Sequence, residues 1–574
     1  LYYASAKILA MTFSKIVTGE TLDSSLVARA QSHPERTALT FIEKGETHSI
    51  SSPELLERSQ AAAAQLAAGG VGAGDLVVLV LQHSLELIYS FWGAALLGAI
   101  PSIFPFLTEK LDPDLYRQRV KLLVEHSEAR AVVTYPENYG LLSELLGDTA
   151  SRVLSTKEIF GGPSITQKPT SGFGPETLEI SPDDIALLQH SSGSTGLQKG
   201  VALSHRAVLR QIEAYGRAIA LDPEADVIVS WLPLYHDMGL IAGFVMPIVA
   251  GAHLVLMSPF DWVRQPGILL DAIHQYRGTL CWLPNFAYNL IARTLRAKDG
   301  LDLSSWRAAI NCSEPVYAES HQLFLDKLAP YGLSARALAV SYAMAENTFA
   351  VTQTELGAPP RVDTVEVAAI QERGDAVPAA QGKRFVSCGP AIDTVELRIL
   401  DKAGNLLAER RVGEIALRSE FMLSDYYKRP DLTQKAITKD GWYLSGDMGY
   451  LAGGELYVTG RKKDLIIVGG KNIYPQDIEA IANRVAGIRP GRAVAFGVMD
   501  ERLGSEKIVV VCEAAEGGDQ AEAERELRAA IVKETEATLG DLRFVPRGWI
   551  VKTSSGKHAR SDNREKYLRD FSQV

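Results

Sequence analysis

Apolar runs and amphipathic segments alternate over the first two thirds of the chain. Continuous apolar runs at residues 75–81 and 129–134 predict strands that are buried on both faces. Residues 85–97 have the length and periodicity of a helix, and another helix is expected after Ser51, which forms a capping box with Glu54. This alternation predicts an α/β fold in which helices cover both faces of a parallel sheet.

The pattern changes twice in the last third of the chain, and 574 residues are too many for a single core. After about residue 390, short strands and turns predict a small β subdomain. Beyond Arg461, a small α+β unit is expected. Its elements are strands at 465–468 and 507–512, a helix from Pro475 and a helix over 521–536. We therefore expect an N-terminal domain at 11–459, with Met11 as the natural start, and a C-terminal domain at 460–574.

One apolar stretch has nearly the composition of a membrane-spanning helix. Residues 239–257 are apolar except for His253. Pro247 and a turn at 251–252 interrupt them, so a helix packed on a sheet and a separate strand at 254–257 are predicted instead. No membrane span is expected.

Charge and cysteine content argue against two classes of protein. The formal net charge of −10 does not suit a general nucleic-acid-binding protein, which needs a basic surface to neutralise phosphates. Cys281, Cys312, Cys388 and Cys512 form no CxxC pair and have no histidine at metal-ligand spacing. A zinc site or a disulfide framework is not expected, and a reducing, cytoplasmic setting fits best.

The strongest local motif is a loop of small residues that follows an apolar strand at 185–189. Small residues let the backbone approach a polyphosphate, and a terminal lysine supplies positive charge. The loop consists of Ser191, Ser192, Gly193, Ser194, Thr195, Gly196, Leu197, Gln198, Lys199 and Gly200. It matches neither a Walker A loop nor a nucleophile elbow. A flexible surface loop is the alternative that this motif alone leaves open.

Five further segments accompany this loop in a fixed order. They are Tyr235-His236-Asp237-Met238-Gly239, Ser341-Tyr342-Ala343-Met344-Ala345-Glu346, Tyr443-Leu444-Ser445-Gly446-Asp447, Gly460-Arg461-Lys462-Lys463-Asp464 and Thr553-Ser554-Ser555-Gly556-Lys557. Together the six segments resemble the acyl-adenylating superfamily of acyl-CoA synthetases, peptide synthetase adenylation domains and luciferases. The resemblance covers most of the chain, although Ala343 stands where glycine is usual.

The resemblance implies a site for ATP, Mg²⁺ and a carboxylic acid. Lys557 is implied to bridge the carboxylate and the α-phosphate, because two anions approach each other only when positive charge shields them. Glu346, with Thr195 of the loop, is implied to hold Mg²⁺ on the phosphates. Asp447, assisted by Arg461, is implied to accept hydrogen bonds from the ribose hydroxyls.

The adenine site, the acyl gate and the hinge are implied in the same way. Tyr342 is implied to stack on adenine, while Ser313, Glu314 and Pro315 line the opposite wall. His236 gates the acyl pocket in the family. Lys463 matches the hinge about which the mobile C-terminal domain rotates between adenylation and transfer to a thiol.

Each of these residues has a structural alternative when it is taken alone. Asp447 could cap a turn, Glu346 could pair with a surface base, and Lys557 could be one more lysine of the charged tail at 557–566. His236 could be a core histidine with satisfied hydrogen bonds. The functional interpretation is favoured because the segments occur together.

Three features resemble the fatty acyl-AMP ligases, the branch that passes the acyl group to an acyl carrier protein. His-Asp-Met-Gly at 236–239 and Asn-Cys-Ser-Glu-Pro at 311–315 are typical of that branch. Residues 354–385 resemble its insertion and end at a Val-Ser-Cys-Gly segment. Within them, 362–370 alternates like a strand and 374–382 indicates a loop. An ordinary surface elaboration is the alternative.

The acyl pocket is expected to be apolar. Residues 239–249 and 282–288 supply Leu, Ile, Phe and Met side chains suited to an alkyl chain. The expected pocket residues are Asp237, Met238, Gly239 and Phe286.

The sequence therefore predicts a ligase that uses ATP and Mg²⁺ to activate a fatty acid as acyl-AMP, with release of pyrophosphate. The expected acceptor is the phosphopantetheine thiol of a carrier protein of the polyketide or peptide synthase type. A medium- or long-chain acyl-CoA ligase is the nearest alternative, and a luciferase-like oxygenase is more distant. An inactive carrier-binding module is disfavoured because five residues for the chemistry are present: Lys199, Glu346, Asp447, Arg461 and Lys557.

Overall fold

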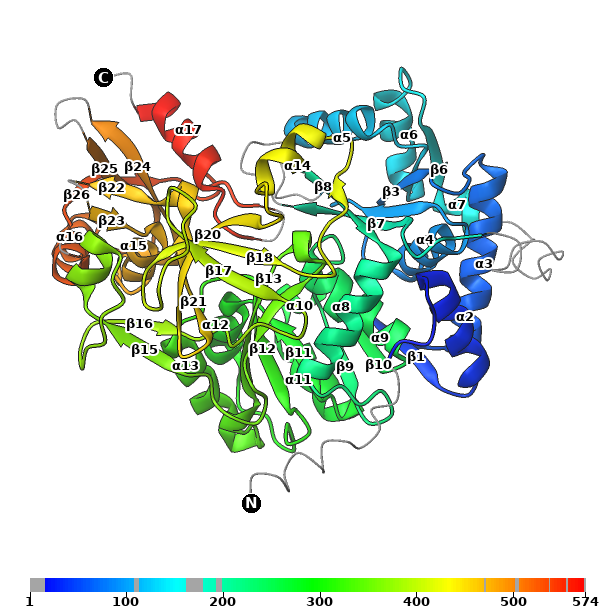
Figure 1. The fold of residues 1–574 in the computed structure, drawn as a ribbon, viewed down its shortest axis with the longest axis horizontal. Helices are drawn as coiled ribbons and strands as arrows, with labels where there is room; N and C mark the ends of the chain where they lie inside the picture. Colours follow the sequence, from blue (N-terminus) through cyan, green and yellow to red (C-terminus); the bar gives the residue numbers. More distant parts are fainter. Residues whose placement is uncertain are drawn as a thin grey trace.

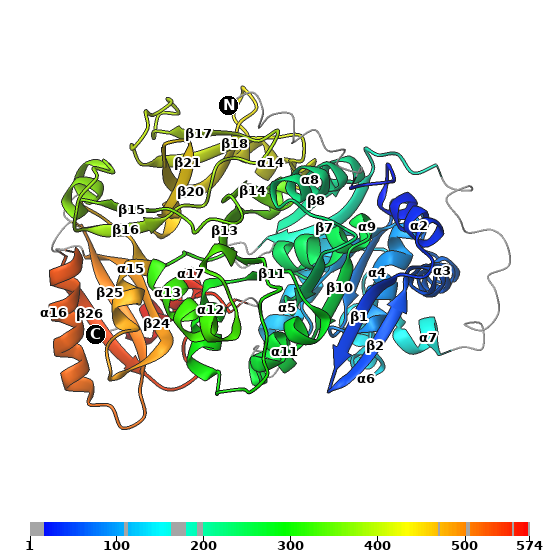
Figure 2. The same cartoon turned by 90° about the horizontal axis from the view of Figure 1, so that it is seen from below.

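The chain forms a mixed α/β fold with a large N-terminal part and a small C-terminal part, as the sequence predicted (Figure 1). The computed structural model describes residues 16–107, 113–161, 179–191, 199–468, 471–500, 505–535, 537–553 and 556–571. Two large sheets and a smaller β-rich unit make up the large part, and the small part lies at one end of the molecule (Figures 1 and 2).

The first large sheet has seven strands in the order β19-β8-β7-β4-β3-β5-β6. Val77 and Leu79 of β3 belong to the core that α3 and α4 cover, whereas Val78 and Val80 pack with α5 on the opposite face. The strands are β3 (Leu76–Val80), β4 (Ile100–Ile103), β5 (Ala131–Thr134), β6 (Arg152–Ser155), β7 (Ile185–Ser191), β8 (Lys199–Ser204) and β19 (Asp425–Tyr426). The helices are α3 (Ser52–Ala68), α4 (Leu85–Leu96), α5 (Pro113–Ser127), α6 (Pro136–Leu145) and α7 (Thr156–Phe160).

The second large sheet has eight strands in the order β14-β13-β12-β11-β9-β10-β1-β2. The strands are β1 (Thr37–Glu43), β2 (Glu46–Ser51), β9 (Val227–Ser230), β10 (His253–Met257), β11 (Leu280–Leu283), β12 (Ala308–Asn311), β13 (Leu338–Ala343) and β14 (Ala350–Gln353). The helices are α2 (Leu22–Ser32), α8 (His205–Ala218), the π-helix η2 (Met238–Val245), α9 (Met246–Ala250), α10 (Pro259–Arg264), α11 (Gly267–Tyr276), α12 (Asn285–Thr294) and α13 (Ala318–Leu328).

A four-stranded antiparallel sheet follows, in the order β17-β18-β20-β21. Its strands are β17 (Glu396–Leu400), β18 (Gly413–Arg418), β20 (Tyr443–Ala452) and β21 (Glu455–Arg461), and α14 (Pro430–Ala436) precedes β20. The predicted insertion contains the antiparallel pair β15 (Val362–Val365) and β16 (Lys383–Val386). The short π-helical turn η6 (Ala369–Arg373) lies between them.

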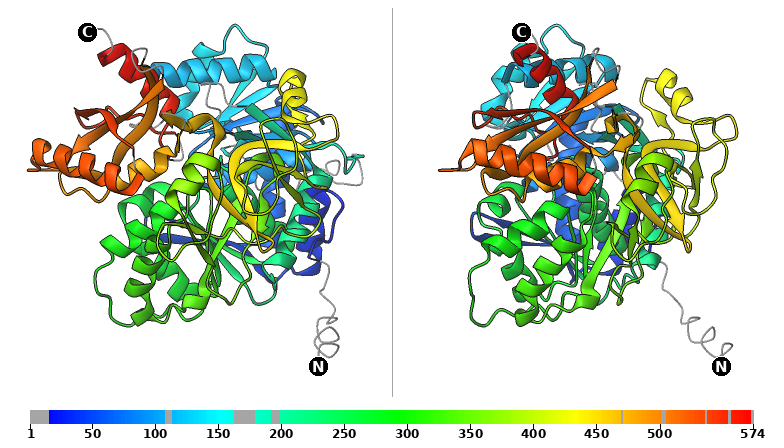
Figure 3. Two further views of the ribbon diagram at one scale, coloured as in Figure 1. Left: turned by 60° about the vertical axis from the view of Figure 1, so that its left-hand side comes forward. Right: turned by 90° about the vertical axis from the view of Figure 1, so that its left-hand side faces the viewer.

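The small C-terminal part is built on the sheet β24-β25-β26. Its strands are β22 (Ile466–Val468), β23 (Lys471–Ile473), β24 (Ile488–Asp500), β25 (Ser505–Ala514) and β26 (Leu539–Val545), and its helices are α15 (Pro475–Ala482), α16 (Gln520–Thr535) and α17 (Arg560–Phe571). One face of the sheet packs on α15 and α16, and the other packs on α17 (Figure 3).

Two expectations need correction. The large sheets are not wholly parallel: β7 pairs with β8, β1 with β2, and β13 with β14 in antiparallel orientation, because short connections return the chain beside itself. The strand expected over 362–370 ends at Val365. Residues 369–373 turn into η6 instead, which buries Ile370 in a local core with Phe385.

The apolar stretch at 239–257 divides as expected into helical and strand elements, although its first helix is a π-helix. Gly243 packs so closely on β9 that a β-carbon there would lie 2.6 Å from Ser230 Oγ. Within the described ranges of the chain, no helix is both long and apolar enough to cross a bilayer.

Candidate active site

A buried carboxylate lies where β20 and β21 pair. Asp447 and Arg461 are register partners in this ladder, and Arg461 Nε lies 3.0 Å from Asp447 Oδ1. Tyr342 Oη, from β13, donates a 2.7 Å hydrogen bond to Asp447 Oδ2. The Asp447 charge raises the pKa of Arg461, and burial raises the pKa of Tyr342 well above its ordinary value. Three residues predicted for the nucleotide therefore meet in one cluster.

Glu346 is held by Tyr426, a residue for which the sequence predicted no role. Glu346 lies in the 3-10 turn η5 (Ala345–Asn347). Tyr426 Oη donates a 2.9 Å hydrogen bond to Glu346 Oε1 and lies 3.0 Å from Tyr443 Oη. Burial raises the pKa of Tyr426, so the phenol keeps its proton and remains a donor. Lys199 Nζ lies 4.5 Å from the centroid of the Tyr426 ring. Tyr426 thus links the predicted metal ligand to the lysine of the loop.

The phosphate loop is framed by two strands. Ser191 at the end of β7 is the register partner of Lys199 at the start of β8. The loop residues Ser192, Gly193, Ser194, Thr195 and Gly196 lie outside the described residues, and so do their predicted contacts. Among the residues that are described, no three His, Cys, Asp or Glu side chains gather as metal ligands.

The remaining residues of the adenine segment serve the sheet as well. Ser341 Oγ donates a 2.8 Å hydrogen bond to the carbonyl of Thr352 in the neighbouring strand β14. Met344 and Ala345 are buried, and Ala343 is partly exposed at the end of β13. Of this segment, Tyr342 and Glu346 are the side chains that reach the clusters described above.

The predicted opposite wall has a backbone kink and a helix cap. Ser313 has a φ of 72°, in the left-handed region, and its Oγ lies 3.7 Å from Met238 Sδ. Glu314 accepts a 2.9 Å hydrogen bond from the backbone N–H of Phe286 at the start of α12. Glu314 therefore satisfies one of the free donors of that helix. Pro315 is exposed.

The C-terminal part brings Lys557 close to the His236 segment. Burial, and then the Lys557 charge, lower the pKa of His236 to about 3. Burial raises the pKa of Asp237, although Lys557 and Arg461 oppose this effect. The His236 Nε2 atom is buried and has no hydrogen-bond partner within the described residues. The lowered pKa keeps His236 a neutral imidazole, and among the described residues its Nε2 lacks the hydrogen bond that a satisfied core histidine would have.

Lys557 sits on a tight turn. Thr553 N–H donates to the Lys557 carbonyl at 2.8 Å, and Lys557 N–H donates to Thr553 Oγ1 at 3.2 Å. An isolated bridge between Lys552 and His558 closes the base of the turn. The backbone on both sides of Lys557 is thereby fixed, although residues 554 and 555 lie outside the described ranges.

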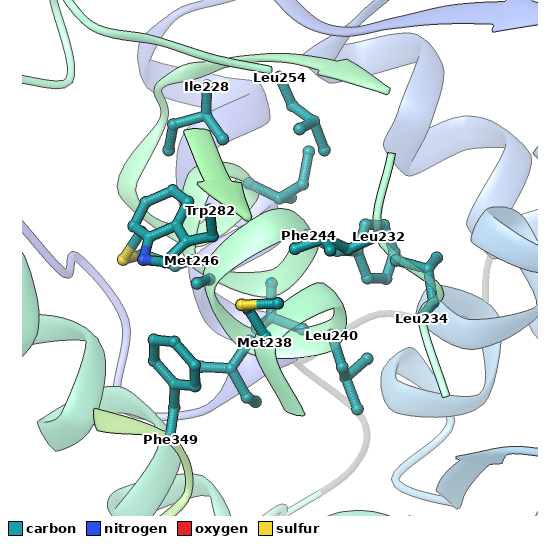
Figure 4. Close-up of a cluster of buried hydrophobic side chains, with 14 of the residues drawn as sticks. Ile228, Leu232, Leu234, Met238, Leu240, Phe244, Met246, Leu254, Trp282 and Phe349 are labelled. Carbon is teal, nitrogen blue, oxygen red and sulfur yellow. The ribbon is translucent and has the colours of Figure 1, made fainter. Parts of the chain in front are cut away.

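The apolar segment after Asp237 fills the interior of the large part (Figure 4). Asp237 starts η2, since its side chain accepts a 2.8 Å hydrogen bond from Met238 N–H. A β-carbon at Gly239 would lie 2.3 Å from the Pro233 carbonyl oxygen, so this position requires glycine. The buried side chains around η2 include Leu232, Leu234, Met238, Leu240, Phe244, Met246 and Trp282.

Phe286, also predicted for the acyl pocket, is in a different environment. Its side chain is 37% exposed and meets Trp231 and Trp262 edge-on, with ring centroids 6.1 Å apart in both pairs. Trp231 and Trp262 stack on each other at 3.5 Å. The predicted pocket residues are therefore divided between the buried η2 segment and this aromatic cluster.

The predicted insertion contacts the small C-terminal part. Lys383 Nζ lies 2.5 Å from Asp477 Oδ2 and 4.5 Å from the centroid of the Tyr474 ring. Lys471 Nζ lies 3.3 Å from Glu372 Oε1. Both contacts cross from residues 354–385 to residues beyond the predicted hinge at Lys463, which lies in the 3-10 turn η7 (Lys462–Asp464). Burial lowers the pKa of Lys463.

Tyr426 is the clearest functional candidate that sequence reasoning missed. It follows β8 by more than two hundred residues and stands beside a second tyrosine, so no local pattern marks it. The antiparallel pairing of β19 with β8, with Tyr426 opposite Val201, brings it to the phosphate loop. Only the sheet topology reveals this contact.

Comparison with known proteins identifies the family of this chain. A family described as "AMP-binding enzyme" matches residues 26–427. The chain is 31% identical over 605 residues to the "Long-chain-fatty-acid--AMP ligase FadD26" of Mycobacterium bovis, covering 96% of this chain and 98% of that protein. It is 31% identical over 575 residues to the "Medium-chain-fatty-acid--[acyl-carrier-protein] ligase JamA" of Moorena producens, covering 96% and 95%.

A solved structure agrees with these relatives. It comes from work on fatty acyl-adenylate ligases from E. coli and L. pneumophila and superposes with a TM-score of 0.87 at 30% identity. The match covers 96% of this chain and 98% of that one. The chain belongs to the AMP-binding enzyme family and is a ligase, as the motif order predicted.

Proposed function

We propose that this protein activates a fatty acid with ATP and transfers the acyl group to the phosphopantetheine thiol of an acyl carrier protein. The observation that carries the proposal is the position of Lys557. The lysine comes from the small part, yet its charge acts on His236 and Asp237 of the large part. Arg461, which is paired with Asp447, acts on the same Asp237.

The proposed reaction has two steps. A carboxylate oxygen of the fatty acid attacks the α-phosphorus of ATP, the bond from that phosphorus to the bridging oxygen breaks, and pyrophosphate leaves with the electron pair. The thiol sulfur then attacks the acyl carbonyl carbon, the bond to the phosphate oxygen breaks, AMP leaves, and the thiol proton passes to solvent. Positive charge is needed mainly in the first step, because there two anions must meet.

The residues take roles that their geometry supports. We propose that Asp447 accepts hydrogen bonds from the ribose, since Tyr342 and Arg461 keep its carboxylate in one orientation. We propose that Tyr342 also provides the wall for adenine, and that Lys557 bridges the carboxylate and the α-phosphate. We propose that neutral His236, whose Nε2 has no partner among the described residues, faces the acyl carboxylate beside Lys557.

Mg²⁺ is proposed to bind through Glu346. The donor set fits, since a single carboxylate with phosphate oxygens and water is the usual environment of Mg²⁺ on a nucleotide. The bound ion would neutralise charge on the phosphates, while the hydrogen bond from Tyr426 to Oε1 orients Glu346. Thr195 remains a proposed ligand, and Lys199 a proposed phosphate contact.

A carrier protein is the proposed acceptor, and CoA the alternative. One relative is named as a ligase of fatty acids and an acyl carrier protein, and the other is named as a fatty-acid--AMP ligase. The contacts of residues 354–385 with the small part oppose rotation about Lys463. The division into 11–459 and 460–574 is part of this proposal, and so is a cytoplasmic setting, which the four buried free cysteines support.

Product analysis tests the proposal. The full chain is incubated with ATP, Mg²⁺ and a panel of fatty acids of different length, alone, with CoA, or with a holo carrier protein. We expect acyl-AMP in every mixture and thioester only with the carrier protein. Rapid acyl-CoA formation would identify an acyl-CoA ligase, and an oxidised product with oxygen uptake would identify an oxygenase. Absence of acyl-AMP with every acid would refute fatty acid activation.

A further inference from the structure

A charged cluster outside the site connects the hinge to the turn that carries Lys557. Arg560, the first residue of α17, uses its whole guanidinium in this cluster. Its Nε and one terminal nitrogen donate to Glu479 Oε1 and Oε2 at 2.9 and 2.6 Å, and the other terminal nitrogen donates to Asp464 Oδ2 at 2.8 Å. Bidentate pairing of this kind fixes orientation as well as distance.

The three charged residues of this cluster, Asp464, Glu479 and Arg560, come from three different elements. Asp464 ends η7, directly after Lys463. Glu479 lies in α15 and is buried, and its Oε1 also accepts a 3.1 Å hydrogen bond from Ala495 N–H of β24. Arg560 therefore ties the first turn after the hinge to the helix and to the central sheet of the small part.

The same cluster holds the turn of Lys557 from the other side. His558 Nδ1 lies 3.5 Å from Glu479 Oε2, and Ala559 N–H donates to the Val551 carbonyl at 3.3 Å. Burial alone would raise the pKa of Glu479, but Arg560 and His558 outweigh it and lower the pKa to about 2. Glu479 is thus a permanent anion between the two basic residues.

We propose that Arg560 is a positioning residue that transmits the rotation at the hinge to the Lys557 amine. Asp464 directly follows the proposed hinge residue Lys463 and accepts a hydrogen bond from Arg560, which is only three residues from Lys557. We call the pairing of Arg560 with Asp464 and Glu479 the clamp. With the clamp intact, the hinge angle and the position of the Lys557 amine change together. With the clamp broken, the small part still rotates, but Lys557 is no longer held at one place. This inference rests on the proposed role of Lys557 in adenylation.

The consequence is a split between the two half-reactions. A misplacement of about 1 Å at a reacting group costs on the order of 10²-fold in rate. Acyl-AMP formation needs the lysine at the α-phosphate, whereas transfer from acyl-AMP to a thiol does not. The KM for ATP should not change, because Asp447 and Tyr342 lie in the large part.

The test uses the full chain with Asp464→Asn, Arg560→Gln and Arg560→Lys. Asp464→Asn removes the negative charge that pairs with Arg560 next to the hinge and leaves the Arg560–Glu479 pair in place, so the small part should stay folded. We expect Asp464→Asn to slow single-turnover acyl-AMP formation roughly 10-fold and Arg560→Gln roughly 10²-fold. Thiol transfer from supplied acyl-AMP should stay within about threefold of the wild type in both variants. Arg560→Lys should recover part of the loss. The double variant should be no worse than Arg560→Gln alone, since the residues act as one unit.

A matched control separates positioning from general stability. Arg489 also pairs with a buried glutamate of the small part, Glu513 at 2.9 Å, but within the described residues it forms no hydrogen bond or ion pair with Asp464 or the turn. Arg489→Gln should leave both half-reactions unchanged. An Asp464→Asn variant with wild-type adenylation, or equal losses in both half-reactions, would overturn the proposal.

Backbone hydrogen exchange gives a readout that does not depend on activity. Asp464→Asn and Arg560→Gln should speed exchange in peptides covering residues 556–559, with β24 and β25 unchanged. Unchanged exchange at 556–559 overturns the clamp even if the wild type makes no acyl-AMP. Conversely, failure of the wild type to form acyl-AMP refutes the proposed function and leaves the exchange result to decide the clamp.

Discussion

Tyr342 Oη donates a 2.7 Å hydrogen bond to Asp447 Oδ2, which joins the strand expected under the adenine to the carboxylate expected under the ribose. Arg461 Nε lies 3.0 Å from the other oxygen of the same carboxylate. Asp447 is therefore held from both sides before any nucleotide binds. This arrangement leads to an ordered prediction for two variants.

Asp447→Ala should weaken ATP binding by about 1–3 kcal/mol, because the ribose hydroxyls lose their acceptor. Tyr342→Phe should cost less, about 1 kcal/mol, since the carboxylate remains and loses only one of two orienting partners. Calorimetric titration with ATP measures both values, and fatty acid binding serves as the control. An Asp447→Ala variant with wild-type ATP affinity would show that another carboxylate binds the ribose.

Lys557→Ala should lower the rate of acyl-AMP formation by ~10²–10³-fold, the loss typical of a group that stabilises charge in the transition state. Transfer of the acyl group from supplied acyl-AMP to a thiol should survive. Rapid-quench assays of each half-reaction measure the two rates. Lys566→Ala is the matched control, because Lys566 lies in α17 and donates to the Trp549 carbonyl at 2.8 Å, away from the site. Equal loss in both half-reactions contradicts the assignment.

Tyr426→Phe should raise the Mg²⁺ concentration needed for half-maximal adenylation about threefold to tenfold, since Glu346 loses an orienting hydrogen bond worth about 1 kcal/mol. The ring stays beneath Lys199, so saturation by ATP at high Mg²⁺ should be normal. Tyr426→Leu removes the ring too and should also raise the KM for ATP. The hydroxyl of Tyr426 is not needed if Tyr426→Phe has the Mg²⁺ dependence of the wild type.

The fold was predictable where a single element carries its own pattern. The buried run of β3 and the helix α4 were recognised because periodicity and length are local properties. The antiparallel edges of the sheets and the turn η6 were not, since both depend on which distant segment covers an apolar face. Val365 ends its strand because Ile370 and Phe385 close a small core beyond it, and no local signal at 362–370 encodes that contact.

The site was predictable as a set of segments but not as a set of contacts. The motif order singled out Asp447, Glu346 and Lys557, whereas two contacts near them join residues that are far apart in the chain: Tyr426 with Glu346, and Arg560 with Asp464. Deletion of residues 359–382 would not be a clean test of the insertion. Removing 359–382 would delete β15, and with it Asp363, which Arg410 and Tyr450 contact at 3.0 and 2.7 Å.

Acid should destabilise the large part through the buried side chain of His190. Burial lowers the pKa of His190 to about 4 from an ordinary value of 6.5. Between these values the unfolded chain binds a proton that the folded chain does not, so the free energy of unfolding falls as the pH drops through 6.5 toward 4. His190 alone should account for about 2 kcal/mol at pH 5. Urea unfolding of the wild type and of His190→Gln, at pH 7.5 and pH 5, measures this. A variant with the same pH dependence as the wild type contradicts the prediction.

The acceptor is best tested at the contact between the insertion and the small part. Lys383→Ala removes both the ion pair with Asp477 and the stacking of the ammonium over Tyr474, and Glu372→Ala removes the ion pair between Glu372 and Lys471. If these contacts stabilise the adenylating arrangement of the two parts, the double variant should form acyl-CoA about tenfold faster than the wild type. This increase corresponds to a shift of about 1.4 kcal/mol in the rotation equilibrium. Acyl-AMP formation should not rise.

Arg384→Ala is the control for that experiment, because Arg384 is the neighbouring residue but pairs with Glu319 within the large part. It should leave the CoA reaction unchanged. The wild type should accumulate acyl-AMP with CoA present and form thioester with a holo carrier protein. Rotation breaks the contacts between the insertion and the small part, and a bound carrier protein can replace them with contacts of its own, whereas free CoA cannot. Mass spectrometry of the thioesters distinguishes the two acceptors. Fast acyl-CoA synthesis by the wild type would contradict the carrier-protein assignment, because the contacts of Lys383 and Glu372 would then be present without limiting the rotation that the transfer requires.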